Sequence, residues 1–142
     1  MDEIELMGSV FLARRRRFAE RLRVFAITLP QFNLIQLARR RGAISLSAAA
    51  VELSWDRPTT TLVARKCVAS KWLSRKRSYS DRRSFKLSLT GHGEELLDRI
   101  ESDRLLWPES LGDPLDILDS KERAELFRIL DKVHRRAQDV LI

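Results

Sequence analysis

The sequence predicts a mainly α-helical protein with a small antiparallel β-wing, and three observations support this fold class. Apolar residues recur at helical spacing through most of the chain, and several expected helices begin at capping residues. Residues 85–89 alternate apolar and polar side chains with a period of two, which is typical of a strand. Residues 75–83 hold five Lys and Arg side chains against one acid, as expected of an exposed hairpin tip rather than a core segment.

The first helix is expected over residues 4–26, where Phe11, Phe18, Leu22 and Phe25 recur at spacings of seven, four and three. An arginine run, residues 14–17, lies inside this helix. Such a run is usually solvated surface, and contact with DNA phosphates is the alternative.

The second helix begins with a capping box. Thr28 is the expected N-cap, and Gln31 follows three residues later. This helix ends at Arg39–Gly42, where Gly42 suits the position after a helix end.

Two short helices joined by about three residues come next. After a very short strand at residues 43–45, Ser47 is expected to cap a helix that ends at Leu53. Asp56 then caps a helix over residues 57–69, whose second position is Pro58, where a missing N–H costs nothing. This order is typical of a helix-turn-helix.

The helix at 57–69 has two different faces. The inward stripe is modestly apolar and contains Thr60, Val63, Ala64 and Cys67. The opposite face is basic and hydroxylic and contains Arg57, Thr59, Thr61, Leu62 and Arg65. These side chains would let the helix lie deep in a groove.

The wing is expected between strands at residues 72–74 and 85–89, with a basic tip over residues 75–84. Asp81 and Arg83 are two residues apart, so they project to the same side of an extended segment. The carboxylate can therefore hold the guanidinium in one orientation.

The C-terminal part predicts two further helices. Thr90 caps one that runs to about Trp107, and Asp119 with Glu122 caps a last one that reaches Leu141. Their apolar stripes, with that of the first helix, exceed what one small winged domain can cover. Self-association through the two ends of the chain would bury them.

Charge points to a polyanionic partner. The 142 residues carry a net charge of +7, and residues 39–86 alone hold 13 Lys and Arg against 3 Asp and Glu, a net +10. A single cysteine excludes an intrachain disulfide and favours a reducing compartment. The sequence shows neither a membrane-spanning apolar run nor a signal-peptide core, so we expect a soluble, cytoplasmic protein.

Enzymatic chemistry finds little support. The two histidines, His92 and His134, lie far apart, and the sequence shows no cluster of metal ligands. It also lacks a Gly-rich phosphate loop, a nucleophile elbow and paired carboxylates, so we expect no catalytic residue, cofactor or metal. Cys67 is expected to be a small buried hydrophobe, and a redox role is the alternative.

Several motifs together resemble the MarR (multiple antibiotic resistance regulator) family of winged-helix transcription factors, over essentially the whole chain. They are the segments 29–32, 50–53 and 57–59, then Asp81-Arg82-Arg83 followed by Leu89-Thr90 and Gly93. The resemblance implies a homodimer in which residues 1–28 and 91–142 form dimerisation helices and residues 29–90 form the DNA-binding lobe. It departs at Lys71, where relatives have glycine, and at Leu62, where relatives often have a polar or basic side chain.

The resemblance places the recognition helix 57–69 in the major groove and the wing 75–84 in the minor groove. Arg83 would then enter the minor groove, held by Asp81, and Pro58 would lie at the DNA-facing helix start. Arg57 or Arg65 could contact guanine, and Thr59 and Thr61 thymine methyls or phosphates. Expected phosphate contacts are Lys66, Arg75, Lys76, Arg77 and Arg82, with Ser47 at a helix N-terminus.

We therefore expect a homodimeric, sequence-specific regulator that binds a pseudo-palindromic operator in double-stranded DNA and acts as a ligand-responsive repressor. The family suggests a cavity for a small-molecule effector, with Phe11, Phe18, Phe25 and Trp107 as candidate lining. The sequence names no ligand. Two alternatives remain: an interaction module that binds RNA or bulk DNA non-specifically, and a regulator switched by oxidation of Cys67.

Overall fold

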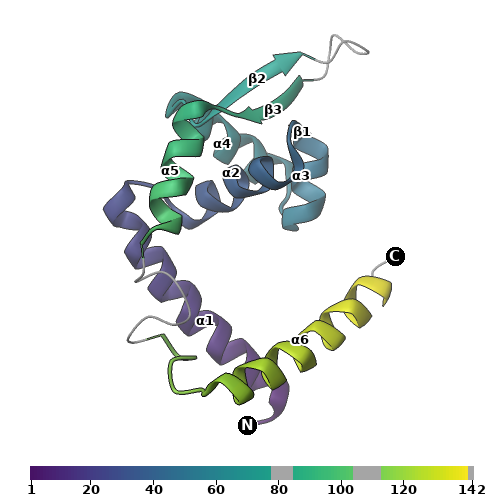
Figure 1. Ribbon diagram of the computed structural model, residues 1–142. Coiled ribbons are helices and arrows are strands. Elements are labelled where there is room, and N and C mark those ends of the chain that lie inside the picture. Colours follow the sequence, from purple (N-terminus) through teal and green to yellow (C-terminus); the bar gives the residue numbers. More distant parts are fainter. Residues whose placement is uncertain (78–84, 104–112, 141–142) are drawn as a thin grey trace. The chain divides into compact units, whose positions relative to one another are not determined.

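A computed structural model describes residues 1–77, 85–103 and 113–140 of the chain (Figure 1). The elements in chain order are α1 (Glu3–Leu22), a 3-10 turn η1 (Arg23–Phe25), α2 (Leu29–Arg41), β1 (Ile44–Ser45), α3 (Leu46–Leu53), α4 (Arg57–Ala69), β2 (Leu73–Arg77), β3 (Phe85–Leu89), α5 (Gly91–Glu101) and α6 (Ser120–Val140). The predicted fold class, mainly α with a small antiparallel wing, is confirmed.

The chain forms two compact units. The winged unit is Arg15–Leu106, and the terminal unit is Met1–Arg14 with Trp107–Ile142. The helix α1 contributes to both units. The division into dimerisation helices and a DNA-binding lobe stays a prediction.

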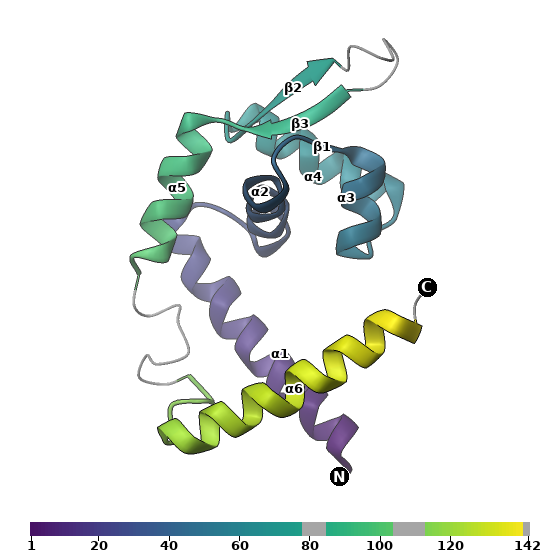
Figure 2. The same cartoon turned by 45° about the vertical axis from the view of Figure 1, so that its right-hand side comes forward.

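The winged unit carries a three-stranded antiparallel sheet in the order β1-β3-β2. Leu73 pairs with Leu89 and Arg75 with Leu87, while Ile44 of β1 pairs with Leu87 from the other side. Strand β2 is longer than the predicted 72–74, because its pairing with β3 continues to Arg77. Figures 1 and 2 show this ribbon extending beyond the helices. The outer end of β2, residues 75–77, is therefore exposed to solvent.

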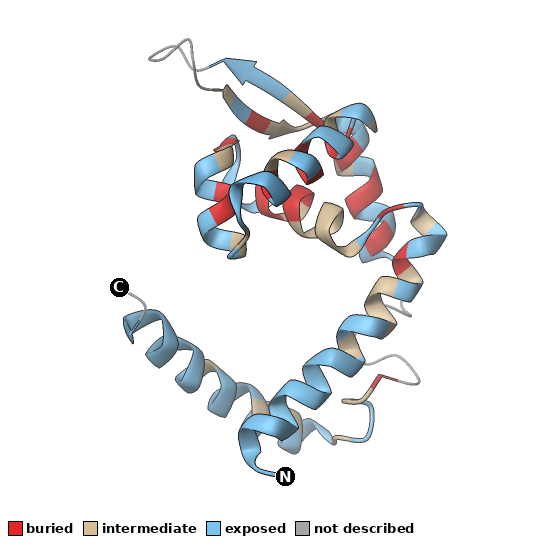
Figure 3. Ribbon diagram, turned by 180° about the vertical axis from the view of Figure 1, so that it is seen from behind, coloured by how far each residue is buried: buried red, intermediate tan, exposed pale blue. Residues whose placement is uncertain are grey.

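The core of the winged unit is built around α2, which lies between α5 and α3 in Figures 1 and 2. The fully buried large side chains include Leu34, Ile35, Leu73, Leu87 and Leu97. Figure 3 shows buried positions on α2, α4 and α5, and α4 and α5 also carry exposed positions, whereas α2 is exposed only at its last two residues. The amphipathic patterns of these helices therefore meet in one apolar centre, which fixes the position of α4 within the unit.

Most predicted helix starts are confirmed. Thr28 and Gln31 form the capping box, with the Gln31 N–H donating to Thr28 Oγ1 at 3.3 Å and the Thr28 N–H donating to Gln31 Oε1 at 3.0 Å. Asp119 and Glu122 make the same reciprocal pair at the start of α6, at 2.8 Å and 3.1 Å.

Three predicted helix boundaries were wrong. The first helix, expected over residues 4–26, ends at Leu22 and is followed by the 3-10 turn η1. The N-cap of α3 is Ser45, whose Oγ accepts from the Ala48 N–H at 3.1 Å, so Ser47 lies inside the helix instead of capping it. Ser45 takes this role because it is the last extended residue of β1. The helix that follows Thr90 ends at Glu101 and not near Trp107, which lies outside the described residues.

The terminal unit leaves much apolar surface exposed. Its buried ion pair joins Arg14 Nε to Asp113 Oδ2 at 3.2 Å. None of the described residues of α6 is buried, and Phe127 is 73% exposed. Other exposed apolar side chains of this unit are Ile4, Leu6, Phe11, Leu12, Ile129, Leu130 and Val133. The uncovered stripes predicted from the sequence are therefore present.

Candidate nucleic-acid interface

The helix α4 begins and ends where the sequence predicts. Asp56 is its N-cap, and its Oδ1 accepts a hydrogen bond from the Thr59 N–H at 2.7 Å. This bond lowers the pKa of Asp56, because it stabilises the ionised carboxylate. Pro58 follows in the first turn, where its fixed φ suits the helix.

The two faces of α4 are confirmed by burial. Thr60, Val63, Ala64 and Cys67 are buried against the rest of the winged unit. The exposed side chains of the opposite face are Arg57, Pro58, Thr59, Leu62, Arg65 and Lys66. Thr61 is half-buried at the edge of this face. Because α4 contains no acidic residue, its exposed face is uniformly basic or neutral.

Ser47 has a different position from the one predicted. Ser47 is the second residue of α3, so it is not the N-cap, but its backbone N–H still belongs to the first turn, where N–H groups have no intrahelical partner. Its Oγ accepts a short hydrogen bond from Arg57 Nη1. This contact links the outer surfaces of α3 and α4, and it limits the directions in which the Arg57 guanidinium can point.

The C-terminus of α4 closes in a Schellman motif. The Trp72 N–H donates to Cys67 O at 3.0 Å, and the Lys71 N–H donates to Val68 O at 2.9 Å. Lys71 adopts a left-handed conformation with φ of 63°, which glycine favours. The chain therefore keeps the backbone path into β2 although lysine replaces the glycine of the resemblance.

The described part of the wing is basic and exposed. Arg75, Lys76 and Arg77 follow one another at the outer end of β2, all exposed to solvent. The Arg75 guanidinium stacks over the Phe85 ring at 4.8 Å from its centroid, which orients it along the ribbon. Asp81, Arg82 and Arg83, including the expected Asp81–Arg83 pair, lie outside the described residues.

Cys67 is fully buried on the inward stripe of α4, as predicted. Burial raises the pKa of its thiol to about 12. Because the thiolate is the reactive form, this environment disfavours the oxidation switch considered as an alternative.

Among the residues that the structure describes, no group of three or more His, Cys, Asp and Glu could hold a metal ion. Within the same residues, no helix is both long and apolar enough to cross a membrane. His92 and His134 are both exposed.

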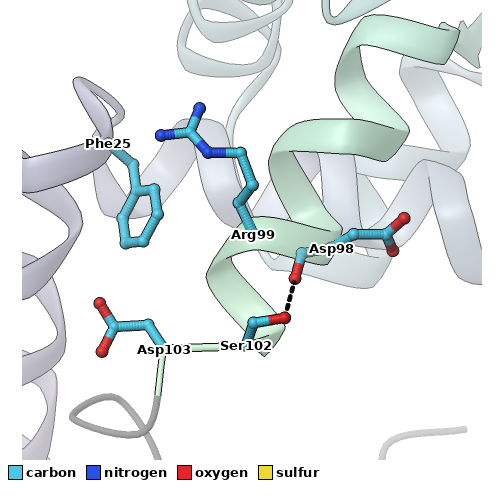
Figure 4. A pocket seen from close by; sticks show the side chains of 5 residues that line it. All are labelled: Phe25, Asp98, Arg99, Ser102 and Asp103. Carbon is cyan, nitrogen blue, oxygen red and sulfur yellow. Dashed lines mark hydrogen bonds between the residues drawn. The ribbon is translucent and has the colours of Figure 1, made fainter.

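A pocket of about 450 Å³ in the winged unit is lined by Phe25, Asp98, Arg99, Ser102 and Asp103 (Figure 4). The Arg99 guanidinium lies 5.5 Å from the Phe25 ring centroid. Asp98 also bonds to Arg39 Nη2 at 3.0 Å, and Asp103 to Arg21 Nη2 at 2.8 Å. Both acidic residues of the lining therefore already form ion pairs with arginines of α1 and α2.

That Phe11, Phe18, Phe25 and Trp107 line an effector cavity stays a prediction. Of the described residues of this set, Phe25 lines the pocket of Figure 4. Phe18 packs on Phe32, with ring centroids 5.1 Å apart. Phe11 is exposed in the terminal unit, and Trp107 lies outside the described residues.

The helices α3 and α4, followed by the β2–β3 ribbon, define a winged helix-turn-helix protein. Residues 27–85, from just before α2 to the first residue of β3, match the model of the MarR family. A search of curated protein sequences found no match. Over residues 27–85 the chain is therefore similar to the MarR family, whose members are transcriptional regulators.

Solved structures agree with this assignment over nearly the whole chain. A MarR transcriptional regulator from Methanosarcina mazei Go1 is 20% identical, with a TM-score of 0.83 and 96% of each chain covered. A single-site mutant of MarR from E. coli is 25% identical, with a TM-score of 0.79 and 94% of this chain and 96% of that chain covered. The same mutant complexed with operator DNA is 24% identical, with a TM-score of 0.73 and 91% of each chain covered.

Proposed function

We propose that this protein is a homodimeric, sequence-specific DNA-binding regulator that represses transcription from a pseudo-palindromic operator. The exposed face of α4 is the observation that carries this proposal. It is a 13-residue helix with a buried apolar side, and its other side offers cations and hydroxyls without one acid. Such a helix fits the major groove, where side chains reach base edges.

The residues that contact DNA fall into two groups by chemistry. Arg57 and Arg65 would hydrogen-bond guanine, while Thr59 and Thr61 would touch thymine methyls or phosphates. The proposed phosphate contacts are Ser47, Lys66, Arg75, Lys76, Arg77 and Arg82. Arg83 would enter the minor groove, oriented by Asp81, and Pro58 keeps the start of α4 close to the DNA.

The complex of E. coli MarR with operator DNA supports this assignment for a chain of the same fold. The net charge of +10 over residues 39–86 supports it independently, since the cations gather on α4 and the wing. Localisation in the cytoplasm follows from this role.

The homodimer is supported by the terminal unit. Its helices expose large side chains such as Ile4, Phe11, Phe127 and Leu130, which a stable monomer would bury. A second copy of the chain presents the same apolar surface, so a two-fold interface would cover both.

The proposal also includes regulation: a small molecule would release the protein from its operator. A related protein, BpsR of Bordetella bronchiseptica, has its DNA binding regulated by 6-hydroxynicotinic acid; it is 22% identical, with a TM-score of 0.75. In this chain, the pocket beside Phe25 and Arg99 could admit a ligand of modest size.

The experiment is a selection of binding sites from a randomised duplex library at about physiological salt. A dimeric regulator should enrich one inverted repeat with half-sites about one helical turn, roughly 34 Å, apart. If bulk DNA or RNA binds while no sequence is enriched, the basic surface is a non-specific electrostatic one, and the interaction-module alternative replaces this proposal.

A further inference from the structure

The exposed face of α4 has an apolar residue at its centre. Pro58, Leu62, Arg65 and Ala69 follow one another at spacings of four, three and four, so they form one line along the helix. At about 100° per residue, this line lies opposite the buried stripe that contains Val63 and Cys67. Leu62 therefore points away from the core of the unit and not along the edge of the helix.

Leu62 is 54% exposed, in the middle turn of a helix whose other outward side chains are mostly basic or hydroxylic. An isolated exposed leucine is ordinary on a protein surface. This one lies between Pro58 and Arg65 on the surface proposed to enter the major groove. A leucine can neither neutralise a phosphate nor donate a hydrogen bond to a base, so it contributes to binding only through apolar contact.

The major groove offers one apolar group for such contact, the C5-methyl group of thymine. Cytosine, adenine and guanine present polar edges there, so a buried leucine would leave their donors or acceptors without partners. A leucine at the centre of the helix face thus favours an A·T pair with the thymine methyl directed at it.

We propose that Leu62 is a specificity-determining residue that packs on the C5-methyl group of one thymine in each operator half-site. This inference rests on the proposed function, because it requires α4 to lie in the major groove. Arg65, three residues further along the same line, is close enough to contact the neighbouring base pair or its phosphate. The half-site would therefore carry a thymine next to the position that Arg65 contacts.

The test uses the duplex enriched by the selection experiment. Each thymine is replaced in turn by deoxyuridine, which keeps base pairing and removes only the methyl group. At the contacted thymine, binding by the unmodified protein should weaken about fourfold per half-site, the effect of leaving one methyl group unburied. Leu62→Ala should bind the thymine and deoxyuridine duplexes equally well.

Two further variants make the result specific to the side chain at this position. Leu62→Met retains apolar contact, so it should keep a preference for thymine. Val24→Ala shortens another exposed aliphatic side chain of the winged unit, outside α3 and α4, and should keep the full preference. The readout is a ratio of affinities for two duplexes, so a general change in protein stability does not alter it.

The outcomes separate this inference from the function on which it rests. An enriched operator whose thymine preference is the same in Leu62→Ala as in the unmodified protein would overturn the role of Leu62 and leave the regulator intact. An operator insensitive to deoxyuridine at every position would do the same. Failure to enrich any operator would overturn the proposed function itself.

Discussion

Gly93 lies where α5 makes its closest approach to the start of the wing, and a single methyl group there should test this packing. A Cβ atom built on Gly93 would lie 2.4 Å from the carbonyl oxygen of Trp72 and 2.6 Å from Leu89 Cδ1. The leucine can rotate away, but the Trp72 carbonyl is backbone and accepts a hydrogen bond from the Thr90 N–H at 3.0 Å. Gly93→Ala therefore requires α5 to shift relative to the recognition helix and wing.

The size of the effect follows from two opposing contributions. Overpacking costs about 1–3 kcal/mol, and a clash with backbone belongs near the upper end. Alanine gains about 1 kcal/mol over glycine within a helix. The expected net loss of unfolding free energy is about 2 kcal/mol, which lowers the urea midpoint by about 1 M for a denaturant slope near 2 kcal/mol/M.

The assay is urea unfolding followed by circular dichroism at one fixed protein concentration, because association would shift the midpoint. Gly91→Ala is the matched control in the same helix, since a Cβ atom there meets nothing within 4 Å. It should leave the midpoint unchanged or raise it slightly. Equal midpoints for the two variants would refute the account of how α5 packs on the wing.

Four further predictions concern the DNA-binding surface and its support. Cys67 should not react with a chromogenic disulfide reagent in the native protein, because its pKa is raised to about 12, and should react once the chain is unfolded in urea; fast native reaction would reopen the redox alternative. Arg57→Ala should relax preference at one base position by about 1–3 kcal/mol, measured with single-base operator variants. Ser47→Ala should relax the same position less and add nothing to Arg57→Ala, because the Ser47 hydroxyl acts through the guanidinium and alanine keeps the backbone N–H proposed to contact phosphate; additive losses would make the hydroxyl an independent contact. Arg83→Ala should weaken operator binding without changing the unfolding midpoint, and native-like affinity would mean that the wing does not enter the minor groove.

The sequence predicts the start of α4 to the residue because the signals there are local. Asp56 and Pro58 specify the start without any distant partner. The burial of Cys67 follows from its helical spacing to Val63 and Ala64, again a property of a short segment. The sequence alone can therefore predict which residues of such a helix are buried and which form its exposed face.

The errors concern residues whose position depends on distant parts of the chain. Ser45 and Ser47 are both acceptable caps, and the choice between them is made by pairing of β1 with β3, through Ile44 opposite Leu87. The end of α5 has no nearby glycine or proline, and Asp103 just beyond it pairs with Arg21 of α1. Neither contact is visible in the local sequence pattern.

Lys71 shows the same dependence on tertiary contacts at the end of α4. A lysine gives no local signal for a left-handed residue, yet its carbonyl accepts a hydrogen bond from Thr90 Oγ1 at 2.5 Å. The buried Trp72 beside it anchors the start of β2. These contacts stabilise a conformation that the side chain alone disfavours.

The most direct test of the account compares two dissociation constants at about 150 mM salt, one for the selected inverted repeat and one for a scrambled duplex of equal composition. A regulator that reads bases through α4 should bind the inverted repeat at least about 10³-fold more tightly. Equal affinities, both falling steeply as salt is raised, would contradict specific recognition and leave only an electrostatic surface.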